Sequence, residues 1–509
     1  MSKALMIQGT GSGVGKSLIV AGLCRIFRDR GVNVAPFKAQ NMALNSFITK
    51  EGGEIGRAQA LQAEAAGIEP SVDMNPILLK ASGESSCQMI MNGRVHSNMK
   101  ATEYYSFKKE AWRAVTEAYE SLSRKHDLII IEGAGSPAEI NLCKDEVVNM
   151  RVARHTGAPV ILIGDIDKGG VFASFYGTVG LLNGDADYIK AFIINKFRGD
   201  MEILMPGLKM IYEKTNIPVI GVIPYLGDLG LHEEDGIPIE RINGARGKGE
   251  RVTKIKIVVI RLRYISNFTD FDPFLYEPDV DLVYSLREGD IENADLLIIP
   301  GSKNTVEDLL FLRENGIEDS IRRAIKKDIP LIGVCGGYQM IGKKILDPFG
   351  VESNHKVVRG FEFLGIETTL KKTKITSQVE ATLVKNSELR VQSENTLKGY
   401  EIHMGVSKGE TGLFRLKRIS SNSSLVTRHS SLIMDGSSKG NVWGTYIHGI
   451  FDNDLFRREL LNSIREKKGL RLIGKVVDYS RLREDALNKW SGIIRKNIDM
   501  KFIEELLKS

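Results

Sequence analysis

Residues 9–17 read GTGSGVGKS, and this stretch decides the fold of the first half of the chain. It follows the short apolar segment 4–7 and precedes residues 18–27, whose apolar side chains recur at helical spacing. A strand, a glycine-rich turn and a helix in this order direct backbone N–H groups at an anion, and the start of the helix adds the positive end of its dipole. The pattern therefore predicts a phosphate-binding loop.

This loop has the residue types that nucleotide phosphates require. In the pattern G-x-x-x-x-G-K-[ST], the lysine (Lys16) reaches the β- and γ-phosphates and the final hydroxyl (Ser17) ligates Mg²⁺. The sequence departs from the pattern at one position, because Thr10 stands where the first glycine is expected. We expect nucleotide contacts from Thr10, Gly11, Ser12, Gly13, Val14, Gly15, Lys16 and Ser17, and from Asn195 at the end of a later strand.

Length and composition exclude several classes of protein. A chain of 509 residues predicts two or three domains, and its 42% hydrophobic and 26% charged residues are ordinary for a soluble globular protein. The apolar runs are strand-sized, so we expect no membrane span and no secretory signal. The net charge of +6 is spread along the chain and does not indicate nucleic-acid binding. Four cysteines without disulfide or zinc spacing favour a cytoplasmic location.

Strands and helices alternate through the first half, which predicts a doubly wound α/β domain around a mostly parallel sheet. Lys38, Gln40 and Asn41 follow the second predicted strand. Open parallel sheets bind ligands at the carboxyl ends of their strands. We therefore expect these three side chains to contact substrate or phosphate.

Glu132 ends the apolar run 128–131 and precedes a Gly-Ala-Gly turn. A carboxylate at the tip of a strand beside a phosphate loop predicts a Mg²⁺ ligand, together with Ser17. The alternative is that Glu132 only caps the next helix. From the helix predicted over 54–67, we expect Arg57, Gln59 and Gln62 to face the same cleft.

Residues 242–254 (INGARGKGERVTK) are glycine-rich, charged and without periodicity, which predicts a linker. The first domain is then 1–241. The strand pattern restarts at 255, and 255–509 is the second domain, another doubly wound α/β unit with a helical C-terminal tail.

The second chemical centre lies in residues 329–342, IPLIGVCGGYQMIG. An apolar strand runs into Cys335, and two glycines begin the next helix. This arrangement is typical of a nucleophile elbow, in which a strained turn presents the thiol at a helix N-terminus. Such a position lowers a thiol pKa from ~8.5 to roughly 3.5–7.5. The alternative is a buried structural cysteine.

Other residues complete this predicted site. His448 ends a late strand and can accept the thiol proton. We expect the Gly301–Ser302 turn to supply a backbone N–H that stabilises an oxyanion together with that of Gly336. Gln339 lies one turn after the nucleophile and is a candidate for binding the substrate of this cysteine.

A set of motifs extends the argument from chemistry to a family. The loop spelling GTxxxVGK[ST] is similar to dethiobiotin synthetase and its amidoligase relatives. The whole set resembles the cobyric acid synthase family, from residue 3 to about 452. The motifs are PFKAQNMALNS (36–46), EIGRAQALQAEAAG (54–67), EGAGSPAEINL (132–142), DIDKGGVFAS (165–174), ISNFTDFDP (265–273), PGSKNT (300–305), GVCGGYQMIG (333–342) and GTYIHGIF (444–451).

This resemblance implies a P-loop NTPase-like domain followed by a class I glutaminase-like domain. It further implies amidation of the b, d, e and g carboxylates of adenosylcobyrinic acid a,c-diamide, giving adenosylcobyric acid. ATP, Mg²⁺, glutamine and a corrinoid would be its small-molecule partners, and Gln339 would help to hold the glutamine. Two alternatives remain open. One has the same chemistry and is cobyrinic acid a,c-diamide synthase. The other belongs to a different class and is a P-loop regulatory or partition ATPase with an inactive glutaminase module. The oligomeric state stays open.

One departure concerns the base of the glutaminase site. Many related amidotransferases carry a glutamate two residues after the histidine, and this chain has Ile450 there. We therefore expect a Cys335–His448 dyad, unless a carboxylate or carbonyl from elsewhere orients the histidine. His403 is a weaker candidate, with a structural or substrate-loop role.

Overall fold

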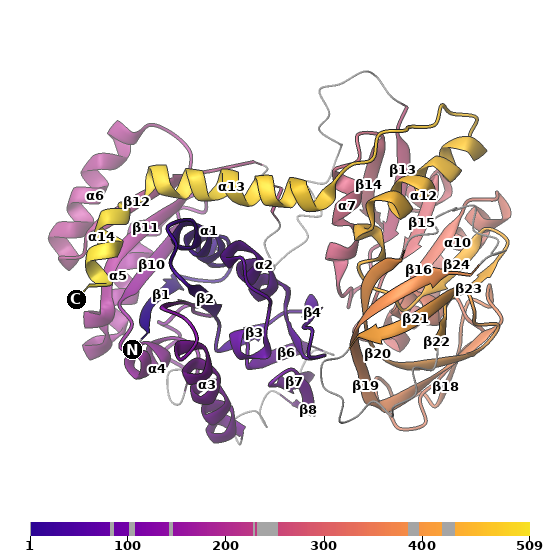
Figure 1. Ribbon diagram of the computed structural model, residues 1–509, viewed down its shortest axis with the longest axis horizontal. Coiled ribbons are helices and arrows are strands. Elements are labelled where there is room, and N and C mark those ends of the chain that lie inside the picture. The colour runs from indigo at the N-terminus through magenta and orange to yellow at the C-terminus, as the bar shows by residue number, and fades with distance from the viewer. Residues whose placement is uncertain are drawn as a thin grey trace.

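The computed structural model describes residues 2–81, 86–100, 107–141, 146–227, 230–231, 253–384, 396–419 and 433–508. They form two α/β domains built on mostly parallel sheets, as the sequence predicts (Figure 1). Of the predicted linker 242–254, only residues 253 and 254 are among those described.

The first domain is organised around a parallel sheet with the strand order β12-β11-β10-β1-β9-β2. Its strands are β1 (Lys3–Gly9), β2 (Val34–Phe37), β9 (Leu128–Glu132), β10 (Val160–Asp165), β11 (Ile189–Phe197) and β12 (Val219–Pro224). All five residues of β9 are buried, because helices cover both faces of the sheet.

Two apolar clusters hold these helices on the sheet. One contains α1 with the late helices α13 (Tyr479–Asn497) and α14 (Met500–Leu506), and the other contains α3 to α6. The helices of this domain are α1 (Lys16–Asp29), α2 (Arg57–Ala66), α3 (Lys108–Ser123), α4 (Met150–Thr156), α5 (Val171–Leu181) and α6 (Met201–Thr215). The phosphate loop, Glu132 and Asn195 therefore lie at one edge, where the parallel strands end.

Smaller sheets lie between this domain and the second. One has the order β3-β6-β7-β8, and a hairpin pairs β4 with β5. Their bounds are β3 (Gln40–Met42), β4 (Ser46–Ile48), β5 (Glu54–Gly56), β6 (Ile77–Ala81), β7 (Ser86–Met91) and β8 (Arg94–Lys100). The sequence predicted a polar turn after β2, and it placed residues 54–56, which form β5, at the start of the helix predicted over 54–67.

The second domain has its own sheet, with the order β14-β13-β15-β16-β24-β23, in which β23 alone is antiparallel. Its strands are β13 (Ile255–Ile260), β14 (Val280–Ser285), β15 (Leu296–Ile299), β16 (Leu331–Val334), β23 (Ser437–Lys439) and β24 (Val442–Thr445). Its helices are α7 (Asp272–Leu275), α8 (Glu288–Glu292), α9 (Thr305–Glu314), α10 (Ile317–Lys326), α11 (Gly336–Met340) and α12 (Asp454–Lys467). Because β16 lies between β15 and β24, their three carboxyl ends lie side by side.

A mostly antiparallel sheet, which the sequence did not predict, follows α11. It contains β17 (Lys344–Leu346), β18 (Val357–Arg359), β19 (Ile366–Leu383), β20 (Leu397–Gly409), β21 (Phe414–Ile419) and β22 (Ile433–Asp435). The long pair β19–β20 extends toward the first domain (Figure 1).

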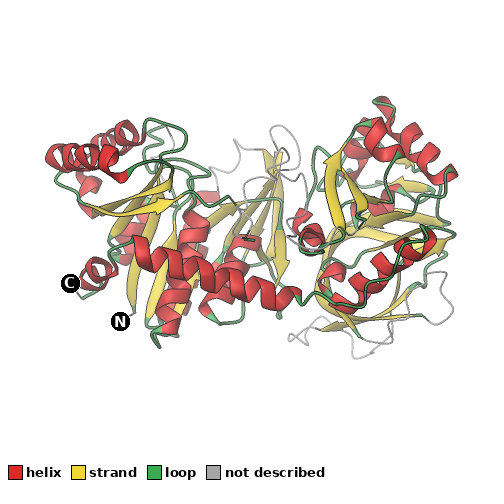
Figure 2. Cartoon of the chain, turned by 90° about the horizontal axis from the view of Figure 1, so that it is seen from above, coloured by secondary structure: helices red, strands yellow, loops and turns green. Residues whose placement is uncertain are grey.

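The C-terminal helices return to the first domain. Chain order groups 255–509 together, yet α13 (Tyr479–Asn497) runs from the second domain across the first and packs on α1 (Figures 1 and 2). Trp490 Nε1 donates to the carbonyl of Leu18 at 2.6 Å. The short helix α14 (Met500–Leu506) adds Ile503 to the same apolar cluster.

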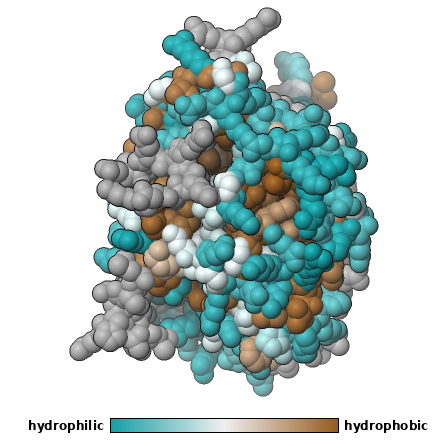
Figure 3. All heavy atoms as spheres, turned by 90° about the vertical axis from the view of Figure 1, so that its right-hand side faces the viewer, coloured by the Kyte–Doolittle hydropathy of each residue, from teal (hydrophilic) through white to brown (hydrophobic). Residues whose placement is uncertain are grey.

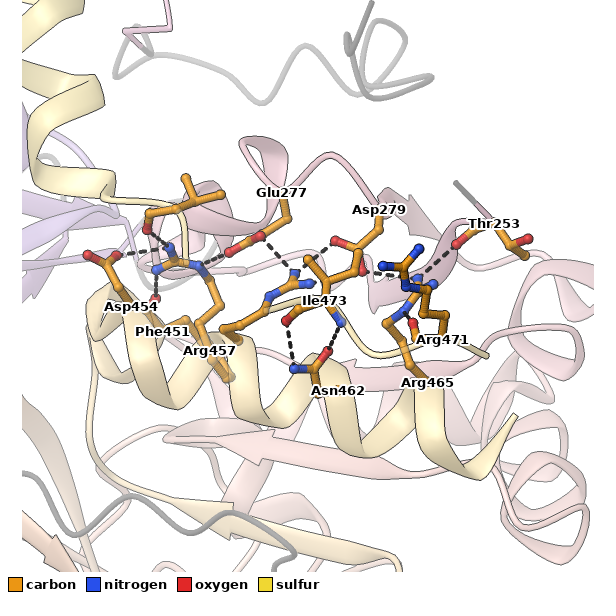
Figure 4. Close-up of polar contacts among 12 residues, drawn as sticks. Thr253, Glu277, Asp279, Phe451, Asp454, Arg457, Asn462, Arg465, Arg471 and Ile473 are labelled. Atoms are coloured by element: carbon orange, nitrogen blue, oxygen red, sulfur yellow. Dashed lines mark hydrogen bonds and ion pairs between the residues drawn. The ribbon is translucent and has the colours of Figure 1, made fainter. Parts of the chain in front are cut away.

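A buried charge network holds α12 and the connection to α13 (Figure 4). Arg457 donates to Glu277 at 2.7 Å and to the carbonyl of Val477 at 2.8 Å. Arg458 bridges Glu277 and Asp279. The start of α13 is thereby fixed relative to the second domain.

The surface of the second domain seen in Figure 3 is mainly hydrophilic, with apolar side chains in small patches. In the described part of the chain, no helix is long and apolar enough to cross a membrane.

Candidate active sites

The phosphate loop has the backbone geometry of its motif. Gly13 and Gly15 have φ of 69° and 97°, in the left-handed region that favours glycine. A Cβ on Gly9 would lie 2.6 Å from Cγ2 of Val14, so the glycine just before the expected position is needed for packing. The Lys16 amine donates to the carbonyl of Gly11 at 2.8 Å, which holds it over the loop.

Glu132 is the centre of the polar contacts beside this loop. It accepts hydrogen bonds from Ser17 Oγ at 2.8 Å, Lys38 Nζ at 2.8 Å and Gln62 Nε2 at 2.5 Å, with Gln59 Nε2 at 3.5 Å. Burial alone would raise the pKa of this carboxyl, but the charge of Lys38 and these hydrogen bonds outweigh it and lower the pKa. The structure therefore brings an ionised carboxylate against the hydroxyl of Ser17.

These side chains line a pocket at the carboxyl edge of the sheet. Its lining consists of Ser12, Gly13, Gly15, Lys16, Ser17, Leu18, Lys38, Asn41, Met42, Glu132, Ala134 and Gly135. Asn41 donates from Nδ2 to Gln59 Oε1 at 3.0 Å. Most of the predicted nucleotide and substrate residues thus converge on one pocket.

Eight predicted residues lie outside that lining, and they are Thr10, Gly11, Val14, Gln40, Arg57, Gln59, Gln62 and Asn195. Thr10 donates from its backbone N to the carbonyl of Ile163, and Asn195 donates from Nδ2 to the carbonyl of Val14 at 2.8 Å, so both support the loop from beneath. Gln40 pairs with β6 through the backbone. Arg57 lies over the ring of Phe47, at 5.6 Å, and not beside Glu132 with Gln59 and Gln62.

The elbow around Cys335 is present in the second domain. Cys335 has φ 52° and ψ −106°, a strained conformation for a residue other than glycine, and it directly precedes α11. Its side chain is 7% exposed, and Sγ lies 3.6 Å from the carbonyl oxygen of Ile402. The turn therefore presents a largely enclosed thiol at the end of β16.

His448 is oriented by a carboxylate, which corrects the expected dyad. Its Nδ1 lies 2.6 Å from Oδ2 of Asp270, whose other oxygen accepts from the backbone N of Gly449 at 3.1 Å. Asp270 comes from the segment after β13. It takes the place of the glutamate that related amidotransferases carry two residues after the histidine, where this chain has Ile450. The expectation of a Cys335–His448 dyad was wrong, and the stated alternative, an unidentified carboxylate, was right.

The charges of this site reinforce one another. Burial opposes the charged form of His448, but the charges of Asp270 and Cys335 outweigh it and raise the histidine pKa to about 10. Because Asp270 occupies Nδ1, the other nitrogen, Nε2, is left for the thiol. Nε2 has no hydrogen-bond partner within the described part of the chain.

The predicted oxyanion groups meet at the same place. A Cβ on Gly336 would lie 2.8 Å from the backbone N of Ser302, and one on Gly301 would lie 3.3 Å from Cε1 of His448. Gln339 donates to the hydroxyl of Tyr446 at 3.3 Å, and its Oε1 has no partner among the described residues. Backbone donors and an amide thus surround the thiol.

Comparison with known proteins identifies the family. Residues 5–239 match the model of the CobQ/CobB/MinD/ParA nucleotide binding domain, and 256–456 match that of the CobB/CobQ-like glutamine amidotransferase domain. Cobyric acid synthase of Thermodesulfovibrio yellowstonii is 50% identical over 99% of both chains. Cobyric acid synthase of Clostridium botulinum is 48% identical over 99% of both chains. That of Caldanaerobacter subterraneus is 46% identical over 100% of this chain and 99% of its own. The chain belongs to the cobyric acid synthase family.

In this member of the cobyric acid synthase family, the two matched regions contain both candidate sites. The nucleotide binding match includes the phosphate loop and Glu132, and the amidotransferase match includes Asp270, Cys335 and His448. The helices α13 and α14 lie beyond both matches.

His403 belongs to the frame of the site. Its Nδ1 lies 2.7 Å from the carbonyl oxygen of Gly405 and its Nε2 lies 3.2 Å from Glu401, while its ring stacks on Tyr446 at 3.9 Å. Both ring nitrogens are therefore engaged, which agrees with a structural role.

Proposed function

We propose that this chain catalyses the glutamine- and ATP-dependent amidation of the b, d, e and g carboxylates of adenosylcobyrinic acid a,c-diamide, giving adenosylcobyric acid. Membership of the cobyric acid synthase family supports this reaction. The observation that carries it is the Asp270–His448 pair at 2.6 Å beside the Cys335 elbow, in a chain that also has a phosphate loop.

In the glutaminase half, Cys335 Sγ attacks the side-chain carbonyl of glutamine, and the oxyanion forms near the backbone N–H groups of Ser302 and Gly336. His448, kept protonated by Asp270, gives a proton to the departing ammonia. Water then hydrolyses the γ-glutamyl thioester and restores the thiol.

In the synthetase half, a corrin carboxylate accepts the γ-phosphoryl group of ATP, and ammonia displaces phosphate from the resulting acyl phosphate. Phosphoryl transfer depends chiefly on positioning and charge neutralisation. Lys16 and Lys38 supply positive charge at the pocket. The same reaction is consistent with the cytoplasmic location that the sequence predicts.

The pocket fits Mg²⁺ through Ser17 and Glu132. Their oxygens lie 2.8 Å apart, and the lowered pKa of Glu132 keeps it charged. Magnesium in nucleotide sites uses one or two carboxylates plus phosphates and water. Bound there, the ion would neutralise charge on the β- and γ-phosphates.

The two alternatives are less well supported. An inactive glutaminase module would not need a carboxylate hydrogen-bonded to His448. Cobyrinic acid a,c-diamide synthase shares the chemistry, but the full-length matches at 46–50% identity are to proteins named cobyric acid synthase.

The test counts amide groups by mass spectrometry after incubation of the purified chain with the a,c-diamide, ATP, Mg²⁺ and amide-labelled glutamine. We expect stepwise addition of labelled nitrogen at all four remaining sites. Cobyrinic acid serves as the comparison substrate. Amidation of cobyrinic acid at a and c, with the diamide left unchanged, would instead identify the a,c-diamide synthase. Absence of glutamine hydrolysis would favour the regulatory ATPase.

A further inference from the structure

One short segment, residues 38–46, runs from the nucleotide pocket to the glutaminase triad. At its start, Lys38 contacts Glu132, and Asn41 and Met42 line the pocket, with Met42 63% exposed. At its end, Asn45 and Ser46 contact the second domain. Only four peptide steps separate Asn41 from Asn45, which limits their separation to about 14 Å at 3.3–3.6 Å per residue.

The end of the segment makes a reciprocal pair of hydrogen bonds across the domain boundary. Oδ1 of Asn45 accepts from the backbone N of Phe268 at 3.0 Å, and Oδ1 of Asn267 accepts from the backbone N of Ser46 at 3.0 Å. Each side chain thereby fixes the backbone of the other domain. We call these four residues the asparagine clamp.

Asn267 connects the clamp to the triad. It is 1% exposed and has φ 53°, and its carbonyl accepts from the backbone N of Asp270 at 3.0 Å. Its Nδ2 donates to the hydroxyl of Tyr400 at 3.2 Å and lies 3.5 Å from Nδ1 of His448. The turn that carries Asp270 thus begins at a residue held by the first domain.

Tyr400 closes a second path between the same groups. Its ring stacks on His448 at 5.3 Å, with an interplanar angle of 17°. Its hydroxyl donates to the carbonyl of Ser46 at 3.3 Å. The histidine is therefore bounded by two side chains, Asn267 and Tyr400, that both touch Ser46.

We propose that Asn267 is a positioning residue through which the asparagine clamp couples the glutaminase triad to the synthetase pocket. The proposal rests on the proposed function. The clamp makes the alignment of Asp270 with His448 and the conformation of residues 38–46 mutually dependent. Nucleotide and corrinoid that favour this conformation of the segment must, by linkage, favour the aligned triad to the same extent. Glutamine is then hydrolysed when its ammonia can be used.

The test compares Asn45→Ala with two controls. Asn45→Asp keeps an oxygen that can accept from Phe268, and Thr376→Val removes a different interdomain hydrogen bond, from Thr376 Oγ1 to the carbonyl of Gly52 at 2.7 Å. Glutamine hydrolysis is measured with and without ATP, Mg²⁺ and the a,c-diamide. Amide formation is measured with glutamine and with ammonium salt.

We expect ATP and the diamide to stimulate hydrolysis in the wild type. Asn45→Ala should reduce that stimulation about fivefold or more, in the range of typical couplings between sites, through kcat and not KM for glutamine. More glutamine should be hydrolysed per amide formed, while amidation with ammonium persists, because Asn45 does not line the nucleotide pocket. Asn45→Asp and Thr376→Val should behave like the wild type.

Three results would overturn the proposal. The first is that ATP and the diamide do not stimulate glutamine hydrolysis in the wild type. The second is that Asn45→Ala keeps the wild-type stimulation and the wild-type ratio of glutamine hydrolysed to amide formed, and the third is that Thr376→Val loses as much stimulation as Asn45→Ala. If Asn45→Ala also loses ammonium-dependent amidation, the Asn267→Gly variant is tested in its place, because glycine retains the left-handed backbone of this position. Unaltered coupling between the two sites in Asn267→Gly refutes the role of the clamp. A wild type that amidates with neither nitrogen source refutes the proposed function instead.

Discussion

At the scale of single residues, the Asp270 carboxylate controls how His448 exchanges protons. With a pKa of about 10, the imidazole stays protonated across the neutral range, although it is buried. Because the pKa of His448 is higher in the folded chain than in the unfolded chain, its protonation stabilises the fold. This contribution is complete below pH about 6.5, the pKa in the unfolded chain, and it is lost as the pH rises through about 10. The same proton is the one that leaving ammonia requires.

Asp270→Asn should therefore lower the glutaminase rate and shift its pH dependence. We expect a loss of roughly 10²–10⁴-fold, the usual contribution of positioned acid–base catalysis. The alkaline limb of kcat/KM, near pH 10 in the wild type, should move to lower pH because the imidazolium loses its counter-charge. The measurement is glutamine hydrolysis from pH 6 to 10.5.

Asp272→Asn is the matched control, since Asp272 is a buried carboxylate two residues along, and the charges that raise the pKa of His448 come from Asp270 and Cys335. It should keep the wild-type alkaline limb. An alkaline limb unchanged in Asp270→Asn would remove Asp270 from the acid–base chemistry.

Sequence patterns found the residues at or near strand ends, although β24 ends at Thr445 and not at His448 as predicted, and they missed Asp270 on a turn. Glu132, Cys335 and His448 each follow an apolar run, so strand periodicity located them. Asp270 is 178 residues from His448 in the chain, and the hydrogen bond between them depends on how β13 and β24 are placed in the sheet. The motif ISNFTDFDP (265–273) contains Asp270, but no spacing rule assigns this residue a role.

At the scale of elements, α13 joins the two domains. It starts beside the buried arginine–carboxylate network of α12 and ends on the first domain. Its Leu487, Trp490 and Ile494 belong to the same apolar cluster as α1. Arg25 of α1 is buried against Glu484 of α13, which adds a charged contact to this packing.

Trp490→Ala should destabilise the first domain by about 3–5 kcal/mol, because it leaves a cavity and removes the hydrogen bond to Leu18. Urea titration with nucleotide binding as the probe would report the midpoint for that domain. Lys489→Ala, on the exposed side of the same helix, should stay within about 0.5 kcal/mol of the wild type. Equal midpoints for the two variants would show that α13 does not support the nucleotide site.

Elements with continuous apolar runs were predictable, and elements with mixed faces were not. The strands of both parallel sheets are buried on both faces, as β9 and β16 illustrate. In β19, buried positions alternate with polar ones that reach solvent, and its partners β17, β20 and β21 lie elsewhere in the sequence. Such pairing depends on tertiary contacts more than on local preference.

At the scale of the whole molecule, charged side chains are buried where the domains meet. Glu54 of β5 contacts Lys80 of the first domain at 3.0 Å and Lys374 of the second at 2.5 Å. Burial would raise the pKa of Glu54, but the two lysines outweigh it and lower the pKa to about 2. Glu54 therefore stays ionised at this interface over the physiological pH range, whereas burial lowers the pKa of its partner Lys374 to about 7.

Cys335→Ala should separate the two halves of the reaction. Amidation with glutamine should fall at least about 10³-fold, because a covalent nucleophile is lost. Amidation with ammonium salt should persist and increase with pH as free ammonia increases, since the nucleotide pocket lies in the other domain. Corrinoid amides formed with each nitrogen source are the measurement. A folded variant that loses both activities, or keeps the glutamine-driven one, would contradict the assignment of Cys335.

The return of α13 to α1 has a consequence for biosynthesis. At roughly 5–20 residues per second, about 20–90 seconds of translation separate the emergence of α1 from that of α13. Throughout that interval the side of α1 that contains Gly22, which packs against Ile494 in the finished protein, has no α13 to cover it. A nascent chain that stalls within the second domain carries an open apolar face on the first. The first domain leaves the ribosome first, but its packing is complete only after α13 and α14, the last helices of the chain, have been synthesised.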